Sequence, residues 1–351
     1  MKADAVMITQ AVDEEDPVLG FTPGWVNGLA RHLGRLSAYC LRAGKHELRH
    51  NVSVQLLGEG KLRRLWRLRK GLKADLNEMN VRAIFAHMCP RYAVAARRIV
   101  GREVPIILWY AQWAKSRWLT AAHKVSRIIL TPVQESCPLQ SDRVRVVGHG
   151  IDTEKFRLVS RKRSGNIVLL SAGRIAREKR YEFLIEAVAA AKEALPLEEL
   201  ALRIVGSPTV PSDEQYFSEL KRVVREKGLD EAVEFRFAVP YTRIQDEYAD
   251  CDLFISTTVR HSFDKAPLEA MACGKIMLTT NQSFRTVLGQ YADLLIAEDQ
   301  NPHDLAKRIV HIARMEPPEC ERLRLALREA VVRDHSLDRL MKEVGDIIAS
   351  L

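Results

Sequence analysis

The segment from His261 to Gly274 joins charged and polar side chains to a short apolar run, a combination suited to holding a ligand. Asp264 and Lys265 precede an apolar stretch that we expect to form a helix from Pro267 to Cys273. Backbone N–H groups at the start of such a helix attract an anion or a polyhydroxyl ligand. Glu269 would lie about one turn further in, within reach of a second part of the same ligand. This pattern suits a sugar nucleotide.

A second charged cluster follows the apolar run from Asn166 to Ser171, which we expect to be a strand. Gly173 allows a tight turn there, and Arg174 and Lys179 flank the start of the next helix. Two cations beside a helix N-terminus can bind a diphosphate through charge pairing, N–H donors and the helix dipole. The alternative for this segment alone is a solvated basic turn, because charged runs usually face water.

The length and composition of the chain limit its class. At 351 residues it is more than twice as long as a typical domain of about 150 residues, so we expect two domains. No run reaches the roughly 18 apolar residues that a membrane-spanning helix needs, and the first residues do not resemble a signal peptide. The 6 cysteines are scattered without a C-x-x-C pair, which is typical of reduced thiols in a cytosolic protein.

Short β-rich runs alternate with helical patterns along the whole chain, which predicts an α/β protein with parallel, doubly wound sheets. The expected strands of the first half are Ala5–Thr9, Leu36–Leu41, Val52–Leu56, Ala83–His87, Ile106–Trp109, Arg127–Leu130 and Arg143–Val147. Those of the second half are Asn166–Ser171, Ala201–Val205, Val233–Phe237, Leu253–Ser256, Ile276–Thr280 and Asp293–Ile296.

The basic, polar run from Ser160 to Gly165 is the best candidate for a linker. We expect an N-terminal Rossmann-like domain over residues 1–158 and a C-terminal Rossmann-like domain over residues 159–335. A C-terminal helix, residues 336–351, is expected to cross back to the first domain. Folds of this kind bind ligands at the C-terminal edges of their strands, so the two domains would face each other across a binding cleft.

Six short motifs follow one another in a recognisable order. They are the loop and helix Gly24–Leu33, Gly148-His149-Gly150-Ile151-Asp152 with Phe156, Gly173-Arg174 with Glu178-Lys179, Ile204-Val205-Gly206, Tyr248-Ala249-Asp250-Cys251-Asp252-Leu253-Phe254, and Leu268-Glu269-Ala270-Met271-Ala272-Cys273-Gly274. Each is weak alone. Together they are spread in order across most of the chain, which resembles the retaining glycosyltransferases of family 4. That family has the two-domain GT-B fold.

The resemblance implies catalytic and donor-binding roles for several side chains. Arg174 and Lys179 would hold the diphosphate of the donor and stabilise the departing nucleoside diphosphate, because fixed cations favour the negative charge that develops there. Glu269, which follows Leu268, would accept hydrogen bonds from the ribose hydroxyls. His87 would contact the donor sugar; the alternative is a structural histidine at a strand–helix junction.

The resemblance also implies contacts made largely by backbone groups. Gly24 would let the N-terminal loop approach the phosphate or the sugar, and Gly173 would allow the turn that precedes the cations. The base of the donor would lie near Val205, Gly206 and the loop at Val239.

One segment departs from the family pattern. The family usually places two glutamates eight positions apart, and the position that corresponds to the first of them is His261. The usual Gly-Phe-Gly reads Ser262-Phe263-Asp264, followed by Lys265. His261 or Asp264 would then hydrogen-bond the sugar hydroxyls. Alternatively, Asp264 caps the helix near Pro267, or the protein is a homologue that has lost catalysis.

We expect no metal site and no cofactor. An Asp-x-Asp occurs at Asp250 and Asp252, but it ends a helix and opens a buried strand, so we interpret it as structural. The fold supplies the needed cations from Arg174 and Lys179, which makes a divalent metal unnecessary.

Positive charge is concentrated in the first half of the chain. Residues 1–158 contain 26 Lys and Arg against 14 Asp and Glu, a net charge of +12, whereas residues 159–351 carry −3. A negatively charged partner is therefore expected to bind the first half. No nucleic-acid-binding motif accompanies the charge, which argues against a nucleic acid as that partner.

The densest basic segment runs from Leu62 to Lys73. As a helix it places leucines and a tryptophan within one broad arc and most of its cations on the other side. Such a helix is typical of proteins that bind the surface of an anionic membrane. The alternative is an ordinary surface helix whose apolar arc packs on the sheet. The residues expected to contact a membrane or an acceptor are Arg63, Arg64, Trp66, Arg67 and Lys70.

The sequence therefore predicts a cytoplasmic GT-B enzyme, peripherally bound to the membrane, that moves a hexose from a nucleotide-diphosphate sugar to an acceptor hydroxyl with retention. The expected acceptor is a lipid-linked or surface glycan intermediate. The alternatives are a sugar-nucleotide epimerase of the same fold and a lipid- or glycan-binding homologue without catalysis. The base, the sugar, the acceptor and the oligomeric state are left open.

Overall fold

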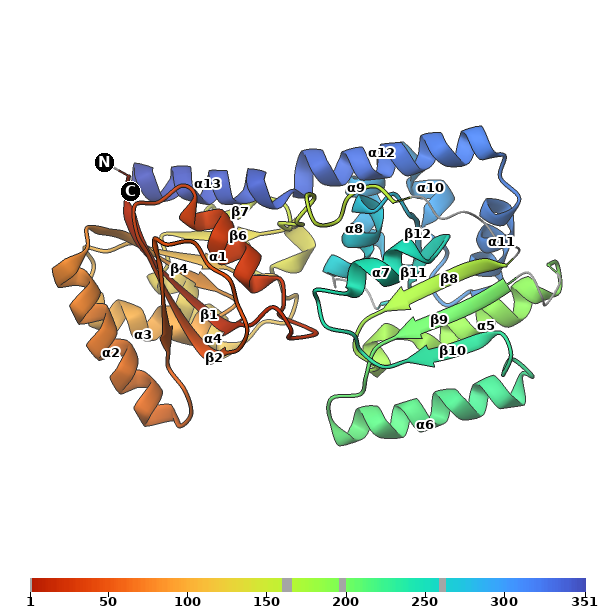
Figure 1. Ribbon diagram of the computed structural model, residues 1–351, viewed down its shortest axis with the longest axis horizontal. Coiled ribbons are helices and arrows are strands. Elements are labelled where there is room, and N and C mark those ends of the chain that lie inside the picture. Colours follow the sequence, from red (N-terminus) through yellow and green to blue (C-terminus); the bar gives the residue numbers. More distant parts are fainter. Residues whose placement is uncertain (1, 160–165, 196–199, 259–262) are drawn as a thin grey trace. The chain divides into compact units, whose positions relative to one another are not determined.

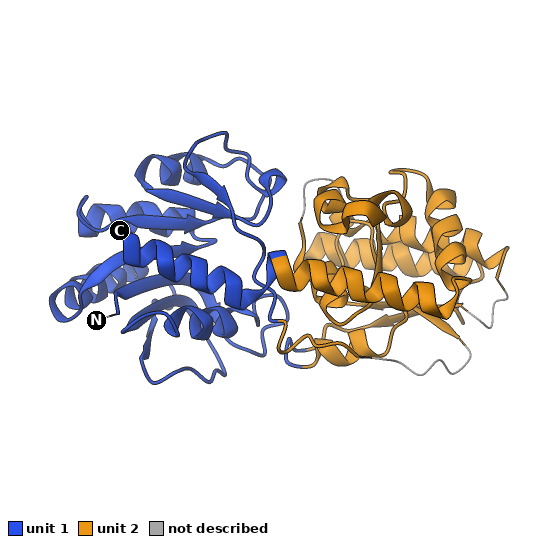
Figure 2. Cartoon of the chain, turned by 90° about the horizontal axis from the view of Figure 1, so that it is seen from above, with its two compact units in different colours: residues 1–152, 240–242, 334–351 blue, residues 153–239, 243–333 orange. Residues whose placement is uncertain are grey.

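A computed structural model describes residues 2–159, 166–195, 200–258 and 263–351. The chain divides into two compact units (Figure 2). Unit 1 contains Met1–Asp152, Pro240–Thr242 and Asp334–Leu351, and unit 2 contains Thr153–Val239 and Arg243–Arg333. The first division thus falls at Asp152, ahead of the expected boundary at residue 158. The expected linker, 160–165, lies outside the described residues.

Unit 1 is built on a 7-stranded parallel sheet with the strand order β3-β2-β1-β4-β5-β6-β7 (Figure 1). The chain adds strands on one side of β1 and then on the other, so the order reverses between β1 and β4. Ligands bind at such a switch point in open parallel sheets. The strands are β1 (Asp4–Val12), β2 (Leu36–Ala43), β3 (Val52–Leu56), β4 (Val81–His87), β5 (Ile106–Trp109), β6 (Ile128–Thr131) and β7 (Val144–Val146).

Helices cover both faces of this sheet because successive side chains of a strand point to opposite sides. Ala5 and Met7 of β1 pack with α1 and α13, whereas Val6 and Ile8 pack with α2, α3 and α4. All four side chains are fully buried, which explains why the strand reads as a continuous apolar run. The helices are α1 (Thr22–Ala30), α2 (Lys61–Glu78), α3 (Pro90–Val100), α4 (Arg117–Val125) and α13 (Leu337–Ser350).

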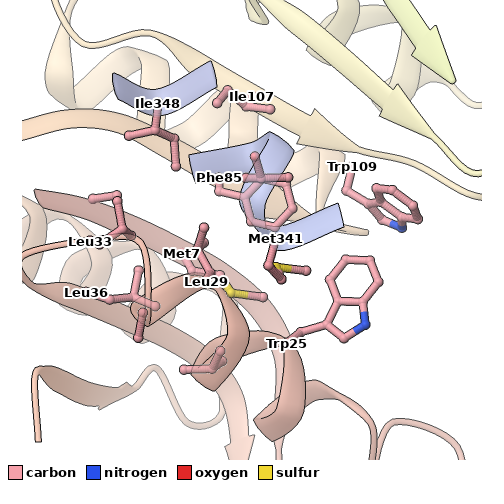
Figure 3. Packing of buried hydrophobic residues seen from close by; sticks show 14 of the residues in the cluster. Met7, Trp25, Leu29, Leu33, Leu36, Phe85, Ile107, Trp109, Met341 and Ile348 are labelled. Carbon is pink, nitrogen blue, oxygen red and sulfur yellow. The ribbon is translucent and has the colours of Figure 1, made fainter. Parts of the chain in front are cut away.

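The last helix of the chain completes the core of unit 1. Figure 3 shows Met341 and Ile348 of α13 among the side chains of α1 and the sheet. Both residues are fully buried. Beside them, Trp25 of α1 and Trp109 of β5 meet edge to face with their ring centroids 4.9 Å apart. The apolar side of α13 therefore covers one face of the sheet of unit 1 and shields it from solvent.

Unit 2 repeats the scheme on a 5-stranded parallel sheet with the order β10-β9-β8-β11-β12, which reverses between β8 and β11. Its strands are β8 (Ile167–Ala172), β9 (Leu200–Val205), β10 (Val233–Arg236), β11 (Leu253–Ser256) and β12 (Ile276–Thr279). Its helices are α5 (Tyr181–Lys192), α6 (Pro211–Glu226), α7 (Ile244–Ala249), α8 (Lys265–Ala272), α9 (Arg285–Leu288), α10 (Ala292–Leu295), α11 (Pro302–Ala313) and most of α12 (Pro317–His335).

The prediction of two doubly wound α/β sheets is confirmed. The strand expected over Asp293–Ile296 is wrong, because this stretch contains α10, and Ile296 forms an isolated parallel bridge to Thr279. A short apolar run cannot be assigned to strand or helix by its periodicity alone. Within the described residues, no helix has the length and apolar character that crossing a membrane requires.

Candidate functional site

The loops that follow β8 and β11 meet at the switch point of unit 2. The chain leaves β8 at Gly173 and β11 at Thr257, both at the carboxyl ends of the strands. Lys179 and Asp264 come from these two loops, and their side chains form an ion pair although the residues are 85 positions apart. The structure thus brings two residues singled out in the sequence to the place where parallel sheets bind ligands.

The segment from Gly173 to Arg180 is held in place by local contacts. Gly173 has a φ of 149°, and a Cβ there would lie 3.1 Å from Cε of Lys179. Arg180 has a φ of 52°, a left-handed conformation that is uncommon for a residue with a side chain. The hydroxyl of Thr257 supports it by donating to the carbonyl oxygen of Lys179 at 2.7 Å, with that of Arg180 at 3.2 Å. These contacts fix the backbone that carries the ammonium of Lys179.

Both cations expected to bind a diphosphate are paired with carboxylates. Arg174 pairs with Glu178, and its Nη1 lies 3.8 Å from Oδ2 of Asp213. Lys179 and Asp264 form the less exposed pair, with side chains 18% and 24% exposed. A phosphate would therefore reach either cation by exchange with a carboxylate.

Asp264 stands at the N-cap position of α8 without capping it. The helix begins at Lys265, two residues before the expected Pro267, and the side chain of Asp264 makes no capping hydrogen bond. Its Oδ2 instead accepts a hydrogen bond from the hydroxyl of Thr258 at 3.0 Å, in addition to pairing with Lys179. The expectation that Asp264 caps this helix is wrong.

Glu269 lies in the middle of α8 and is only 4% exposed. The hydroxyl of Tyr248, from α7, donates to its Oε2 at 2.9 Å. Burial lowers the pKa of Lys265, one turn earlier, to about 7, and the charge of Glu269 opposes that shift. The helix thus holds a buried carboxylate in a fixed orientation close to a lysine.

The segments expected near the base of the donor are neighbours. The N–H of Gly173 donates to the carbonyl of Val205 at 3.0 Å, which joins the ends of β8 and β9. The N–H of Ala238 donates to Oγ of Ser207 at 3.0 Å, which holds the loop containing Val239 beside the end of β9. Val205 at the end of β9, Gly206 after it and the loop at Val239 therefore lie side by side at the carboxyl edge of the sheet.

Replacing Gly206 with alanine is expected to destabilise unit 2, because a Cβ at this position would lie 1.9 Å from the carbonyl oxygen of Gly173. Overpacking of this kind typically costs about 1–3 kcal/mol, and each kcal/mol lowers the melting temperature of a domain of this size by about 2–4 °C. Thermal unfolding followed by circular dichroism measures the effect.

The matched control for this substitution is Gly24→Ala. A Cβ at Gly24 would make ordinary contacts at 3.7 Å with Leu337 and 3.9 Å with Asp152, so no loss of stability is expected. A melting temperature in Gly206→Ala equal to that of the wild type would contradict the close approach of β8 and β9.

His87 ends β4 and belongs to an aromatic cluster of unit 1. It is 2% exposed, its Nδ1 lies 3.0 Å from Oγ1 of Thr9, and its ring centroid lies 4.6 Å from that of Trp25. Thr9 belongs to β1, so His87 stands at the switch point of the sheet of unit 1. The ring of His87 is packed, as the structural interpretation expects, and its contact with the donor sugar stays a prediction.

Gly24 lies in the first turn of α1 and not in a loop, which corrects the expectation for this residue. Pro23 explains the earlier start of the helix, since proline is favoured in the first turn, where its missing N–H costs nothing. Gly24 is the third residue of this helix, so its N–H has no acceptor within the helix, and its approach to the donor stays a prediction.

The remaining donor-site residues of the sequence prediction have different surroundings. Phe263 packs on Phe284, with ring centroids 4.6 Å apart, and Leu268 is fully buried in the core of unit 2. His261 lies outside the described residues. The site residues that sequence reasoning missed are Thr258, Tyr248 and Asp213. For Thr258 a signal exists, because it closely follows a buried strand at the edge where parallel sheets bind ligands.

The carboxylates of the Asp-x-Asp motif bind groups of the protein. Asp250 accepts from Nη1 of Arg203 at 2.9 Å, and Asp252 accepts from the N–H of Val168 at 2.8 Å. Across the described parts of the chain, no three His, Cys, Asp or Glu side chains are grouped as metal ligands would be.

The apolar arc expected on the basic helix α2 is only partly buried. Leu68 and Leu72 are buried against the sheet. Leu62 is 84% exposed, Trp66 61% and Leu65 38%. The apolar residues of the first turns therefore face solvent.

The cations of α2 also fall into two groups. Arg64 donates to the carbonyl of Gly58, and Nη1 of Arg67 donates to that of Leu57 at 3.2 Å, so both bind the loop before the helix. Arg63 and Lys70 are exposed, and Nζ of Lys70 lies 5.5 Å from the centroid of the Trp66 ring. Of the five residues predicted to contact a membrane or an acceptor, Arg63, Trp66 and Lys70 are exposed, whereas Arg64 and Arg67 bind the loop.

Solved structures with the same fold identify its class. The chain superimposes on Anabaena HepE in complex with UDP and glucose with a TM-score of 0.77 at 16% identity, covering 99% of this chain and 100% of that one. It superimposes on sucrose-phosphate synthase from Thermosynechococcus elongatus with a TM-score of 0.78 at 15% identity, covering 99% of both chains. The fold is GT-B, with two Rossmann-like units.

The sequence identifies the family within this class. The family model of glycosyl transferases group 1 matches residues 152–330, and the chain belongs to that family. It is 30% identical to mannosylfructose-phosphate synthase of Agrobacterium fabrum over 56% of this chain and 45% of that protein. It is 24% identical to the human GDP-Man:Man(3)GlcNAc(2)-PP-Dol alpha-1,2-mannosyltransferase over 50% of this chain and 37% of that protein. The matches thus span less than half of either relative.

Proposed function

We propose that this protein is a retaining glycosyltransferase of family 4 that moves a hexose from a nucleotide-diphosphate sugar to an acceptor hydroxyl. The proposal rests on the ion pair between Lys179 and Asp264, which lies at the start of α8 and at the switch point of unit 2. Glu269 is buried in the same helix, one turn further on. Membership of the glycosyl transferases group 1 family supports it, as does the mannosyl transfer named for the human relative.

Each part of the donor has a proposed partner in unit 2. Lys179 and Arg174 bind the diphosphate, Glu269 binds the ribose hydroxyls, and the loops at Gly206 and Val239 enclose the base. No divalent metal is needed in this proposal, because the two side chains supply the positive charge. His87 is the residue of unit 1 proposed to contact the donor sugar.

The proposed reaction breaks the bond between the anomeric carbon and a diphosphate oxygen, and it forms a bond from the acceptor oxygen to the same carbon. The proton of the acceptor hydroxyl passes to the departing diphosphate. Negative charge grows on the leaving group during this step, so fixed cations bind the transition state more tightly than the ground state.

The first test is stabilisation by nucleoside diphosphates. One of UDP, GDP and ADP is expected to raise the melting temperature, because a ligand at 100 times its Kd contributes about 2.7 kcal/mol to stability. Glu269→Gln keeps the size of the side chain and an acceptor for Tyr248 but weakens the acceptor for ribose. It should reduce both affinity and the preference for the ribonucleotide over its 2′-deoxy analogue. No stabilisation by any of the three would contradict the proposal.

The ion pair between Lys179 and Asp264 favours a second candidate, a homologue that binds glycan or lipid without transfer. Donor hydrolysis in the absence of an acceptor separates the two, because a transferase releases the sugar slowly to water. A protein that binds the nucleotide sugar and leaves it intact over days would be the second candidate.

The proposed acceptor is a lipid-linked or surface glycan intermediate, reached by a cytoplasmic enzyme that binds an anionic membrane through α2. Leu62 and Trp66 are exposed apolar side chains on this helix, and its cations Arg63, Arg69, Lys70 and Lys73 are exposed as well. At 100° per residue, Leu62, Trp66, Arg69 and Lys73 share one side of the helix. A face that mixes tryptophan with several cations matches the interface of an anionic bilayer.

A further inference from the structure

The segment between β8 and α5 carries four cations, each of which faces a carboxylate of unit 2. Two pairs are exposed, a setting in which ion pairs contribute little. The side chains are 66% and 45% exposed in Arg177 and Glu219, and 39% and 44% exposed in Arg174 and Glu178. The two least exposed pairs interact more strongly because less water screens them. The four pairs are Arg174–Glu178, Arg177–Glu219, Lys179–Asp264 and Arg180–Asp299.

Among these carboxylates, Asp264 occupies the edge where a ligand is expected. Hydroxyl groups at the end of β11 support it: Oγ1 of Thr258 lies 3.0 Å from Oδ2 of Asp264 and 3.2 Å from Oγ of Ser256. The hydroxyl of Tyr181 donates to the carbonyl of Gly173 at 3.2 Å, and burial, followed by the charge of Asp264, raises the pKa of Tyr181. The negatively charged carboxylate of Asp264 thus lies at the place where a diphosphate would bind.

We propose that Asp264 competes with the donor diphosphate for Lys179 and so limits the affinity of the site for nucleoside diphosphates. This inference rests on the proposed function. The ammonium of Lys179 has three N–H donors, but the paired carboxylate offsets much of its charge. A diphosphate therefore gains the full attraction of Lys179 only by displacing Asp264. The same competition speeds the release of the nucleoside diphosphate product, because the carboxylate reclaims Lys179 as the product leaves.

The test is the affinity of Asp264→Asn for the nucleoside diphosphate that binds the wild-type protein. Asparagine keeps the size of the side chain and removes its charge. Isothermal titration calorimetry is expected to give a Kd about tenfold lower than that of the wild type, as loss of one competing charged hydrogen bond implies. An unchanged or higher Kd overturns the inference. Thermal unfolding without nucleotide establishes that each variant is folded.

A double-mutant cycle shows whether the effect passes through Lys179. In a Lys179→Met background, the gain from Asp264→Asn is expected to shrink to less than about threefold, because the shared ammonium is gone. A full tenfold gain in that background overturns the competition, since it would mean that Asp264 repels the phosphate directly.

Asp299→Asn is the matched control. Asp299 pairs with Arg180 on the same segment, and its side chain is 17% exposed, against 24% for Asp264. No tightening is expected, and a gain equal to that of Asp264→Asn overturns a specific role for Asp264. If neither the wild type nor Asp264→Asn binds UDP, GDP or ADP at millimolar concentration, the proposed function fails together with this inference. If the wild type binds and Asp264→Asn binds no more tightly, the inference alone fails.

Discussion

Replacing Lys179 with methionine is expected to weaken nucleoside diphosphate binding by about 10–100-fold, because a hydrogen bond to a charged group contributes about 1.5–3 kcal/mol. Methionine keeps the apolar stem of the side chain and removes the ammonium. The rate of sugar transfer should fall further than the affinity, since the charge on the departing diphosphate is greater in the transition state than in the bound donor. Calorimetry and a single-turnover transfer assay measure the two effects.

Arg177→Met is the matched control for this prediction. Arg177 lies on the same segment, but it pairs with Glu219, and its guanidinium lies 5.1 Å from the centroid of the Tyr216 ring. Its removal is expected to change the nucleotide affinity by less than about threefold, as for an exposed ion pair away from the ligand. Equal losses in both variants would mean that the segment binds phosphate by its overall charge and not through Lys179.

Neutralising Arg69, Lys70 and Lys73 together is expected to weaken binding to anionic vesicles by roughly 100-fold or slightly more. Each cation near an anionic surface contributes about 1 kcal/mol, and these three are exposed beside Trp66 on α2. Sedimentation with vesicles of phosphatidylglycerol and phosphatidylcholine measures the partition coefficient. Pure phosphatidylcholine is expected to bind both proteins weakly.

Arg64→Gln combined with Arg67→Gln is the comparison for this experiment. Both side chains bind carbonyl groups of the loop at Gly58 and Leu57, so their loss should lower stability more than vesicle binding. The same loss of vesicle binding per charge in both sets of variants would show that the helix acts through its net charge alone. Unchanged binding after neutralisation of Arg69, Lys70 and Lys73 would exclude α2 as the membrane contact.

Much of the fold could be predicted because buried parallel strands have a strong local signature. The run Ile106–Trp109 is apolar at every position, and the structure shows a strand with those bounds, buried on both faces. The stretch Asp293–Ile296 was predicted wrongly because four residues carry too little periodicity to distinguish a strand from a helical turn. The burial of the apolar arc of α2 could not be predicted for another reason. Helical periodicity defines an apolar face, but contacts with the sheet decide how far along the helix that face is covered.

The residues of the site could be predicted from the sequence better than the contacts between them. The proposed roles of Lys179 and Glu269 follow from motifs, and the structure places both at the edge of the sheet in unit 2. The pairing of Lys179 with Asp264 joins residues 85 positions apart and depends on how the loops after β8 and β11 turn. The same holds for the hydroxyl of Tyr248 on Glu269. Such contacts arise from tertiary packing, which a local pattern does not encode.

The helix α13 makes the folding of unit 1 depend on the order of synthesis. Residues 153–333 lie almost entirely within unit 2, so that unit can form its core before α13 has been synthesised. Unit 1 contains Leu340, Met341, Val344 and Ile348, which are fully buried in its core although they are separated from β1 by more than three hundred residues. The part of the chain that is made first is therefore the part that finishes folding last. Until then its open apolar face is exposed to chaperones and to aggregation.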